Sequence, residues 1–280
     1  MSEEDYAPSW RTIGAMAAAV FVITLIGCSA AFALWFRDLG PPQIAVLGTG
    51  NRLSLLVSDG PARLVIATGN DPIAYENALT RLRPIFARRI DLLLVAGDGD
   101  SLLVPLTARD DRHVRRIAAL APLPPSAETA EMGSIDTLTG ARRIQLGPAV
   151  RVTVETAFPF AADPTTDFPS WRATIEHGGT RIVALSDGAA AALFPPSDAT
   201  SVLIVAGDDP VAAWNLAPAV ALIANAEAIG GPELRSAFAG ARRPPQWGFR
   251  VHPNEALRLR FVPGGVEIAS ESAQDLSEAD

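Results

Sequence analysis

The stretch Ile90–Pro105, IDLLLVAGDGDSLLVP, has the pattern of a buried β-strand that ends in a tight acidic turn. Its first part, residues 91–95, is nearly all aliphatic, and Ala-Gly-Asp-Gly-Asp-Ser follows directly. Many α/β enzymes carry catalytic residues on a loop that follows a core strand. We therefore take Asp98 and Asp100 as candidate site residues, although no histidine lies near them.

A second stretch of the chain resembles the first. LLLVAGDGD at residues 92–100 is similar to VLIVAGDDP at residues 202–210, and both are aliphatic strands that end in Ala-Gly-Asp. Two equivalent strands of this kind would bring two loops to one edge of the fold. The repetition therefore favours a fold with two similar halves.

The remaining pattern predicts two groups of strands, each accompanied by helices. Strands are expected at 44–47, 53–57, 64–66, 92–95, 144–146, 150–156, 171–176, 181–185, 202–205, 219–223, 257–262 and 266–269. Helices are expected at 71–82, 110–120, 211–216 and 232–239, and low order at 123–140. This order indicates an α/β fold with two sheets and outer helices in one domain.

Composition limits the possible partners. The formal net charge is −8, and all 23 basic residues are arginine. Nucleic-acid binding depends on clustered positive charge, so this acidic balance argues against a nucleic-acid partner. The single cysteine, Cys28, rules out an internal disulfide and a cysteine metal cage.

The N-terminal region contains 25 uncharged residues, 12–36, between Arg11 and Arg37. As a helix they would measure about 37 Å, which is enough to span a bilayer with some tilt. Trp10 and Trp35 flank the stretch as interfacial anchors do. We expect one uncleaved transmembrane helix, in which Gly27 and Ala31 permit close packing against another helix.

Two alternatives to this anchor are weaker. A cleaved signal peptide has a basic start and a shorter apolar core, whereas this chain starts with Ser-Glu-Glu-Asp. Residues 25–28, Leu-Ile-Gly-Cys, resemble a bacterial lipoprotein box, but the residues after Cys28 stay apolar. The short tail and long C-terminal domain favour a single-pass protein of the bacterial inner membrane, with its domain outside the cytoplasm.

From residue 43 to about 270 the order of segments resembles the metallo-β-lactamase fold, an αββα sandwich, and more narrowly the soluble domain of ComEC-type competence proteins. Residues 44–69 resemble the opening hairpin of that family, and residues 88–105 resemble the strand that leads to its His-x-His-x-Asp-His loop. The most extended likeness lies in residues 146–188, and residues 201–227 follow it. The order and spacing carry this resemblance, since no single motif is specific.

The resemblance also implies where metal ligands should stand, and here the chain departs from the family. Active relatives hold zinc or manganese on several histidines. In the best register, this chain has Ala96, Asp98, Asp100 and Ser101 on the positions of the loop motif. The other ligand positions carry Asp187 and either Gly207 or Asp208. The family's Asp-Gly-Gly end of the opening hairpin is replaced by residues 67–70, Ala-Thr-Gly-Asn.

None of the three histidines falls on a ligand position. His113 is expected in a helix, His177 in a turn and His252 in a strand, each as a surface or structural residue. Carboxylates alone bind hard cations such as Mg²⁺ or Ca²⁺ better than zinc. The aspartates are therefore either solvated turn residues or a divergent cation site.

The domains expected are a tail (1–11), a transmembrane helix (12–36), a linker (37–42), a degenerate metallo-β-lactamase-like domain (43–270) and a disordered acidic tail (271–280). We expect a catalytically inactive protein without a cofactor, which acts as an accessory or assembly subunit of a membrane complex. Its partners would be an integral membrane protein and the bilayer, rather than a small-molecule substrate. The alternatives are a hydrolase with an aspartate-only Mg²⁺ or Mn²⁺ site and a DNA-uptake accessory factor.

Overall fold

The structure is a computed structural model of the chain. It describes residues 18–29, 41–82, 89–97, 104, 113–123, 135–158, 168–194, 200–207, 209–216, 219–225, 246–269 and 274–275. The chain divides into two compact units, Met1–Gly40 and Pro41–Asp280, which are described separately.

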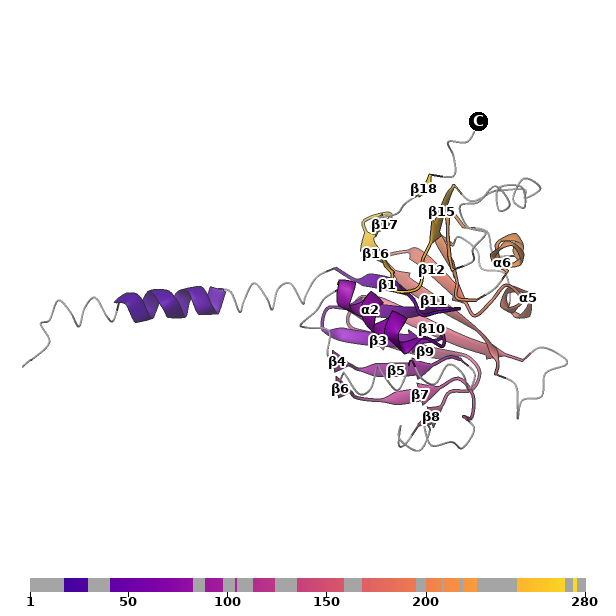
Figure 1. Cartoon of the computed structure of the whole chain (residues 1–280), viewed down its shortest axis with the longest axis horizontal. Helices are drawn as coiled ribbons and strands as arrows, with labels where there is room; N and C mark the ends of the chain where they lie inside the picture. Colours follow the sequence, from indigo (N-terminus) through magenta and orange to yellow (C-terminus); the bar gives the residue numbers. More distant parts are fainter. Residues whose placement is uncertain are drawn as a thin grey trace, which may run out of the picture. The chain divides into compact units, whose positions relative to one another are not determined.

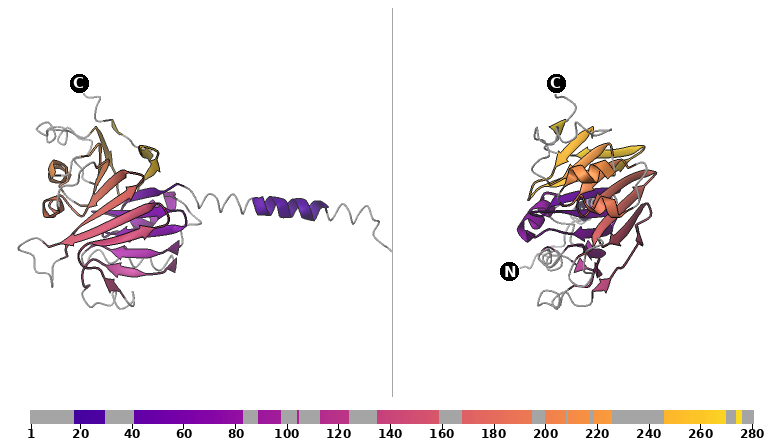
Figure 2. Two further views of the ribbon diagram at one scale, coloured as in Figure 1. Left: turned by 180° about the vertical axis from the view of Figure 1, so that it is seen from behind. Right: turned by 90° about the vertical axis from the view of Figure 1, so that its right-hand side faces the viewer.

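The larger unit is built on two eight-stranded sheets that stack face to face (Figures 1 and 2). The first sheet has the order β17 (Gly265–Ala269), β16 (Ala256–Val262), β1 (Gln43–Gly48), β2 (Leu53–Asp59), β3 (Ala62–Ala67), β5 (Leu92–Val95), β7 (Ile117–Ala119) and β8 (Asp136–Thr137). The second has the order β18 (Gln274–Asp275), β15 (Trp247–Arg250), β14 (Ala221–Ala224), β13 (Val202–Val205), β12 (Thr180–Leu185), β11 (Ser170–His177), β10 (Val150–Ala157) and β9 (Arg142–Leu146). A short pair, β4 (Arg89–Ile90) with β6 (His113–Val114), stands beside them.

The inner faces of the two sheets form the main core. Alternate residues of β1, β2 and β3 point inward, among them Ile44, Leu55 and Ile66, and all three are fully buried. Alternation places every second side chain of a strand on the same face, so these positions meet the inner faces of β10–β13. Burial of this apolar surface holds the sandwich together.

Helices cover the outer faces. The outer residues of β1 and β3 pack with α2 (Pro72–Leu82), whose Tyr75, Ala78 and Leu79 are buried. On the other side, α5 (Ala190–Leu193) and α6 (Pro210–Leu216) cover β12, β13 and β14, with Trp214 at the centre of the contact. The layers therefore follow the order helix, sheet, sheet, helix, as the sequence predicts (Figure 1).

The parallel strands give the sandwich two distinct edges. Strands β3, β5 and β7 run parallel in the first sheet, and β12 to β15 run parallel in the second. We call the edge where these strands end the carboxyl edge, and the edge where they begin the amino edge. In parallel sheets, ligand sites lie at the carboxyl edge, and the two Ala-Gly-Asp turns follow strands there.

One predicted element is wrong. Residues 110–120 were expected to form a helix that contains His113, but the described part forms β6 and β7 instead. Ile117–Ala119 pairs in parallel with Leu93–Val95, and His113 pairs with Arg89. Ala118 enters the main core while its neighbours face outward, which is the alternation of a strand. Pairing with the buried β5 overrides the helical propensity of the alanines.

Other expectations differ in detail. β8 lies within the stretch 123–140, which was expected to be of low order. His177 ends β11 rather than lying beyond it, and His252 follows β15 without belonging to a strand. The helix expected at 232–239 lies outside the described residues. In the acidic tail, Gln274–Asp275 pairs with β15, and the remainder is not described.

In the N-terminal unit, residues 18–29 are helical and exposed, and they contain Gly27. A Cβ atom at Gly27 would meet nothing within 4 Å, which leaves room for a packing partner. Ala31 lies outside the described residues. Among the residues that are described, no helix has both the length and the apolar character needed to cross a membrane.

Candidate functional site

Three of the candidate ligand positions lie at the carboxyl edge within the described residues. Ala96 follows β5, Asp187 follows β12 and Gly207 follows β13. Asp98, Asp100, Ser101 and Asp208 lie outside the described residues. The local sequence explains the placement, because each aliphatic strand is followed at once by small and polar turn residues.

Ala96, which the resemblance places on the first loop histidine, is built into the core. Its side chain is buried, and its backbone N–H donates to the carbonyl of Ala67 at the end of β3 (3.0 Å). Its carbonyl accepts a 3.0 Å hydrogen bond from the indole Nε1–H of Trp171 on β11 of the other sheet. Trp171 is itself buried in the main core. An indole that joins the two sheets therefore lies against this ligand position.

Asp187, on the position of the bridging aspartate, uses both carboxylate oxygens within the protein. Oδ1 accepts a hydrogen bond from the backbone N–H of Ala190 in the first turn of α5 (2.8 Å). Oδ2 accepts a hydrogen bond from the hydroxyl of Ser186 (3.2 Å). A carboxylate that accepts from the backbone at the start of a helix satisfies one of its free N–H groups. Asp187 thus stabilises the turn that leads into α5, whose N-cap position is Ala189.

Gly207 has no room for a side chain. A Cβ atom at this position would lie 2.6 Å from the carbonyl oxygen of Ser186 and 3.4 Å from the Cβ of Asp187. The first of these distances is shorter than a carbon and an oxygen tolerate without movement. The resemblance places either Gly207 or Asp208 on the last histidine position. A metal-binding side chain at position 207 would therefore require a shift at the end of β12.

Three buried hydroxyl residues at the same edge were missed by the sequence analysis. Thr49, Ser54 and Thr68 are fully buried and bond to one another and to nearby carbonyls. The Thr68 hydroxyl donates to the Leu53 carbonyl (2.6 Å), and its backbone N–H donates to the Ser54 hydroxyl (2.9 Å). Thr68 belongs to the Ala-Thr-Gly-Asn segment that replaces the family's Asp-Gly-Gly. The cluster satisfies its own donors and acceptors and thus serves the fold.

Two further hydrogen bonds connect the sheets at this edge. The backbone N–H of Leu53, at the start of β2, donates to the carbonyl of Ala206 after β13 (2.8 Å). The side-chain amide of Asn225, after β14, donates to the carbonyl of Gly50 (2.7 Å). Together with the bond from Trp171, these contacts tie the ends of the two sheets to each other.

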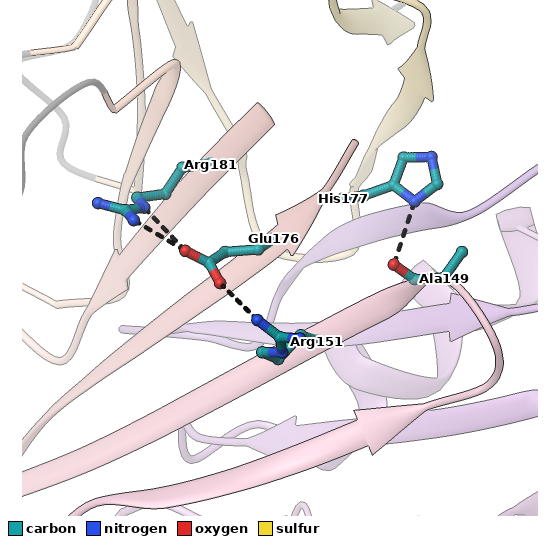
Figure 3. Close-up of polar contacts among 5 residues, drawn as sticks. All are labelled: Ala149, Arg151, Glu176, His177 and Arg181. Atoms are coloured by element: carbon teal, nitrogen blue, oxygen red, sulfur yellow. Dashed lines mark hydrogen bonds and ion pairs between the residues drawn. The ribbon is translucent and has the colours of Figure 1, made fainter. Parts of the chain in front are cut away.

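His252 follows β15 at the carboxyl edge, where its backbone carbonyl lies against Gly48 at the end of β1, whereas His177 lies at the other edge. The Nδ1 of His177 lies 3.3 Å from the carbonyl oxygen of Ala149 at the opposite, amino edge (Figure 3). Its ring is also tilted against that of Phe261, with 5.1 Å between centroids. His252 is exposed and its backbone N–H donates to Glu255. His177 is thus a residue that packs between the sheets.

The donor set at the described positions does not fit the zinc or manganese of the fold. Those metals take imidazole nitrogens together with carboxylate oxygens. The three described positions offer a methyl group, a hydrogen-bonded carboxylate and a glycine. Within the described part of the chain, no three His, Cys, Asp or Glu residues gather as a metal site would require.

Comparison with known proteins addresses the fold. No protein-family model matches the chain, and no curated protein matches it significantly. Among solved structures, Zn²⁺-bound PqqB from Methylobacterium extorquens aligns over 78% of this chain and 100% of its own, at 14% identity and a TM-score of 0.52. The chain has a metallo-β-lactamase-like fold.

Two further structures align less closely. A candidate metal-dependent hydrolase from Parabacteroides distasonis covers 76% of this chain and 94% of its own, with 10% identity and a TM-score of 0.46. MEM-A1, a subclass B3 metallo-β-lactamase from a soil metagenome library, covers 61% and 79%, with 12% identity and a TM-score of 0.42. Sequence identities this low support no statement beyond the fold. The narrower resemblance to ComEC-type proteins stays a prediction.

Proposed function

We propose that this chain is a membrane-anchored, catalytically inactive member of the metallo-β-lactamase fold that serves as an accessory or assembly subunit of a membrane protein complex. The bond from the Trp171 indole to the Ala96 carbonyl carries the proposal. It uses the position of the first metal-binding histidine to connect the two sheets. The proposal includes the bacterial inner membrane as the location, with the folded domain outside the cytoplasm.

The residues around that bond support the proposal that the protein is catalytically inactive. A metal site of this fold needs ligands that converge on an open position for water or substrate. Here Asp187 accepts hydrogen bonds with both of its oxygens, and Gly207 is packed against the Ser186 carbonyl. These contacts give Asp187 a structural role and leave no space for a ligand side chain at Gly207.

The membrane part of the proposal is supported by the sequence. The 25 uncharged residues between Arg11 and Arg37 have the length of a span, and Trp10 and Trp35 bracket them. The described helix 18–29 within this stretch exposes Phe21, Ile23 and Ile26, each at 60% or more. Apolar side chains on a helix without an internal partner are suited to lipid or to another helix.

The leading alternative is a hydrolase that uses an aspartate-held Mg²⁺ or Mn²⁺. It is favoured by one observation, since Asp187 lies at the carboxyl edge where a cation of this fold would bind. In that case free lone pairs of the Asp187 carboxylate would hold the ion beside the hydrogen bonds that it accepts from Ala190 and Ser186. The two functions therefore differ in what Asp187 does.

Manganese titration of the full-length protein in lipid nanodiscs separates the two functions. The electron paramagnetic resonance signal of free aqueous Mn²⁺ falls when the ion binds, and it detects weak sites that would be lost on desalting. We expect no stoichiometric binding. One bound ion per chain that is lost in Asp187→Asn would instead establish the hydrolase alternative.

Asp71→Asn is the matched control. Asp71 accepts a hydrogen bond from the backbone N–H of Ala74 in α2 (2.9 Å), as Asp187 does from Ala190 in α5. Both variants keep a side-chain oxygen that can accept this hydrogen bond, so both should stay close to the stability of the original protein. A metal effect confined to Asp187→Asn would then report coordination rather than unfolding.

A further inference from the structure

The amino edge of the first sheet carries a row of polar residues. Arg260, Gln43, Ser58 and Arg63 stand opposite one another in four successive strands. The row continues at Asp91, whose backbone N–H donates to the Arg63 carbonyl (3.0 Å) and whose Oδ2 accepts from the Arg63 backbone N–H (3.1 Å). The strand ends at this edge are thus polar, in contrast to the apolar strand interiors.

The excess of positive charge is concentrated at one corner of this row. Arg115 and Arg116 immediately precede β7, and both are exposed. Neither makes an ion pair with another residue that the structure describes. Arg89, on β4, is 63% exposed at its side chain and pairs with Asp91 (2.9 Å). Among the described residues, these three arginines have one ion-paired carboxylate, Asp91, and Arg115 and Arg116 form no ion pair.

The second sheet adds positive charge at the same edge. Glu176 lies between two arginines on neighbouring strands, at 2.8 Å from Arg181 and 3.9 Å from Arg151 (Figure 3). Arg151 is 50% exposed at its side chain. The edges of the two sheets meet here, because Asp59 at the end of β2 accepts hydrogen bonds from the backbone of Ala149 and Val150.

The other described carboxylates at this edge are mostly engaged. Asp59 is buried and accepts two backbone N–H groups. Glu267 stands opposite Arg260 in register. Asp275 stands opposite Trp247 on the outermost strand of the second sheet, far in strand order from β10. Asp136 on β8, beside β7, is a further exposed carboxylate, so among the described residues three arginines stand against Asp91 and Asp136 at the corner formed by β4, β6 and β7, in a chain whose net charge is −8.

The chain enters the domain at this edge. β1 begins at Gln43, which is four strand steps from Arg115 in the first sheet, or about 20 Å at the usual strand spacing. Six residues, 37–42, separate Gln43 from the end of the uncharged stretch, and they can extend over about 20 Å at most. A bilayer that holds residues 12–36 would therefore lie within reach of the arginine corner.

We propose that the arginine corner, which consists of Arg89, Arg115 and Arg116, docks on the surface of a bilayer that contains anionic phospholipids. Arginine side chains are attracted to such surfaces within a Debye length, and their guanidinium groups bind phosphate in a bidentate manner. Docking would fix the orientation of the domain, with its amino edge on the lipid and its carboxyl edge toward a partner. This inference names a lipid partner for the membrane anchoring proposed above, and it rests on that anchoring.

Arginine-specific labelling of the full-length protein tests the docking. The protein is reconstituted into vesicles of phosphatidylcholine alone or with a third of phosphatidylglycerol, treated with phenylglyoxal, and analysed by peptide mass spectrometry. We expect labelling of Arg115 and Arg116 to fall several-fold on the anionic vesicles. Labelling should recover at about 0.5 M salt, where the Debye length is near 4 Å.

Arg142 and Arg143 provide an internal control. They form a second pair of adjacent exposed arginines, on β9 and opposite Val154 and Thr153 of β10, away from the amino edge. Their labelling should not depend on the lipid charge. Equal labelling of Arg115 and Arg116 on the two kinds of vesicle would overturn the proposal, and so would protection by a DNA duplex without protection by vesicles.

Flotation separates this result from the anchoring itself. If the full-length protein floats with neutral vesicles at high salt, it has an apolar anchor. This result does not depend on whether its arginines bind lipid. If it does not float, the anchoring is refuted, while the labelling still reports on docking. The double variant Arg115→Gln/Arg116→Gln should lose the charge-dependent protection of Arg89, whereas Arg142→Gln/Arg143→Gln should keep it.

Discussion

Replacement of Trp171 by phenylalanine tests whether the carboxyl edge is held closed by the indole. The change removes the N–H that bonds to the Ala96 carbonyl at 3.0 Å in a buried setting. A buried acceptor left without its donor costs about 1–3 kcal/mol. The smaller ring also gives up packing equivalent to about two methylene groups, or about 1.6 kcal/mol. The expected loss is therefore about 2.5–4.5 kcal/mol of unfolding free energy.

For a domain of this size, that loss corresponds to a fall in Tm of about 5–15 °C. Circular dichroism melts at a fixed scan rate measure it, and Trp247→Phe is the control. Trp247 is 40% exposed, so the same substitution there should leave the Tm within about 1 °C, as surface changes do. A Tm for Trp171→Phe as close to the original as that of the control would refute the reasoning, because the indole would then contribute nothing to the closure.

Three further outcomes follow from buried contacts. Asp59→Ala should lower stability by about 2–3 kcal/mol in denaturant melts, because it removes Oδ2, the one oxygen that accepts from both backbone N–H groups. Unchanged melting would contradict this. Gly207→Ala should lower the free energy of unfolding by about 1–3 kcal/mol, because the new methyl group would be crowded against Ser186. The control Gly265→Ala, whose Cβ would meet nothing within 4 Å, should lower it by well under 1 kcal/mol. Equal losses in the two variants would rule out the crowding. Asn225→Ala should lose about 1 kcal/mol and speed hydrogen exchange at the carboxyl edge; an unchanged exchange rate there would count against its role in joining the sheets.

The strands were predictable because their patterns are strong. Residues 92–95 and 202–205 are uniformly aliphatic, and each forms a parallel strand at the predicted positions. The closing hairpin of β16 and β17 was found from its Pro-Gly-Gly turn. The exception at 110–120 shows the limit of this reasoning. The alanines of this segment favour a helix. The segment forms a strand because its backbone pairs with the neighbouring strand β5.

The candidate site was predictable only as a set of positions. Ala96 and Asp187 follow core strands at one edge, as expected from the turns in their sequence. Nothing in the sequence indicated that Trp171 would reach Ala96, since the two residues are 75 positions apart. Nor did it indicate that Asp187 would bond to the first turn of α5, or that Thr49, Ser54 and Thr68 would form one buried cluster.

The sequence by itself determined the layered α/β architecture and the uncharged N-terminal stretch. These are properties of local composition and periodicity, which a linear chain displays directly. The tertiary structure decided which groups fill the ligand positions and which charges share the amino edge. Hydrogen bonds and ion pairs between distant segments depend on the stacking of the two sheets, because only the packed core brings Trp171 to Ala96 and places Arg115 and Arg116 at the edge where the chain enters.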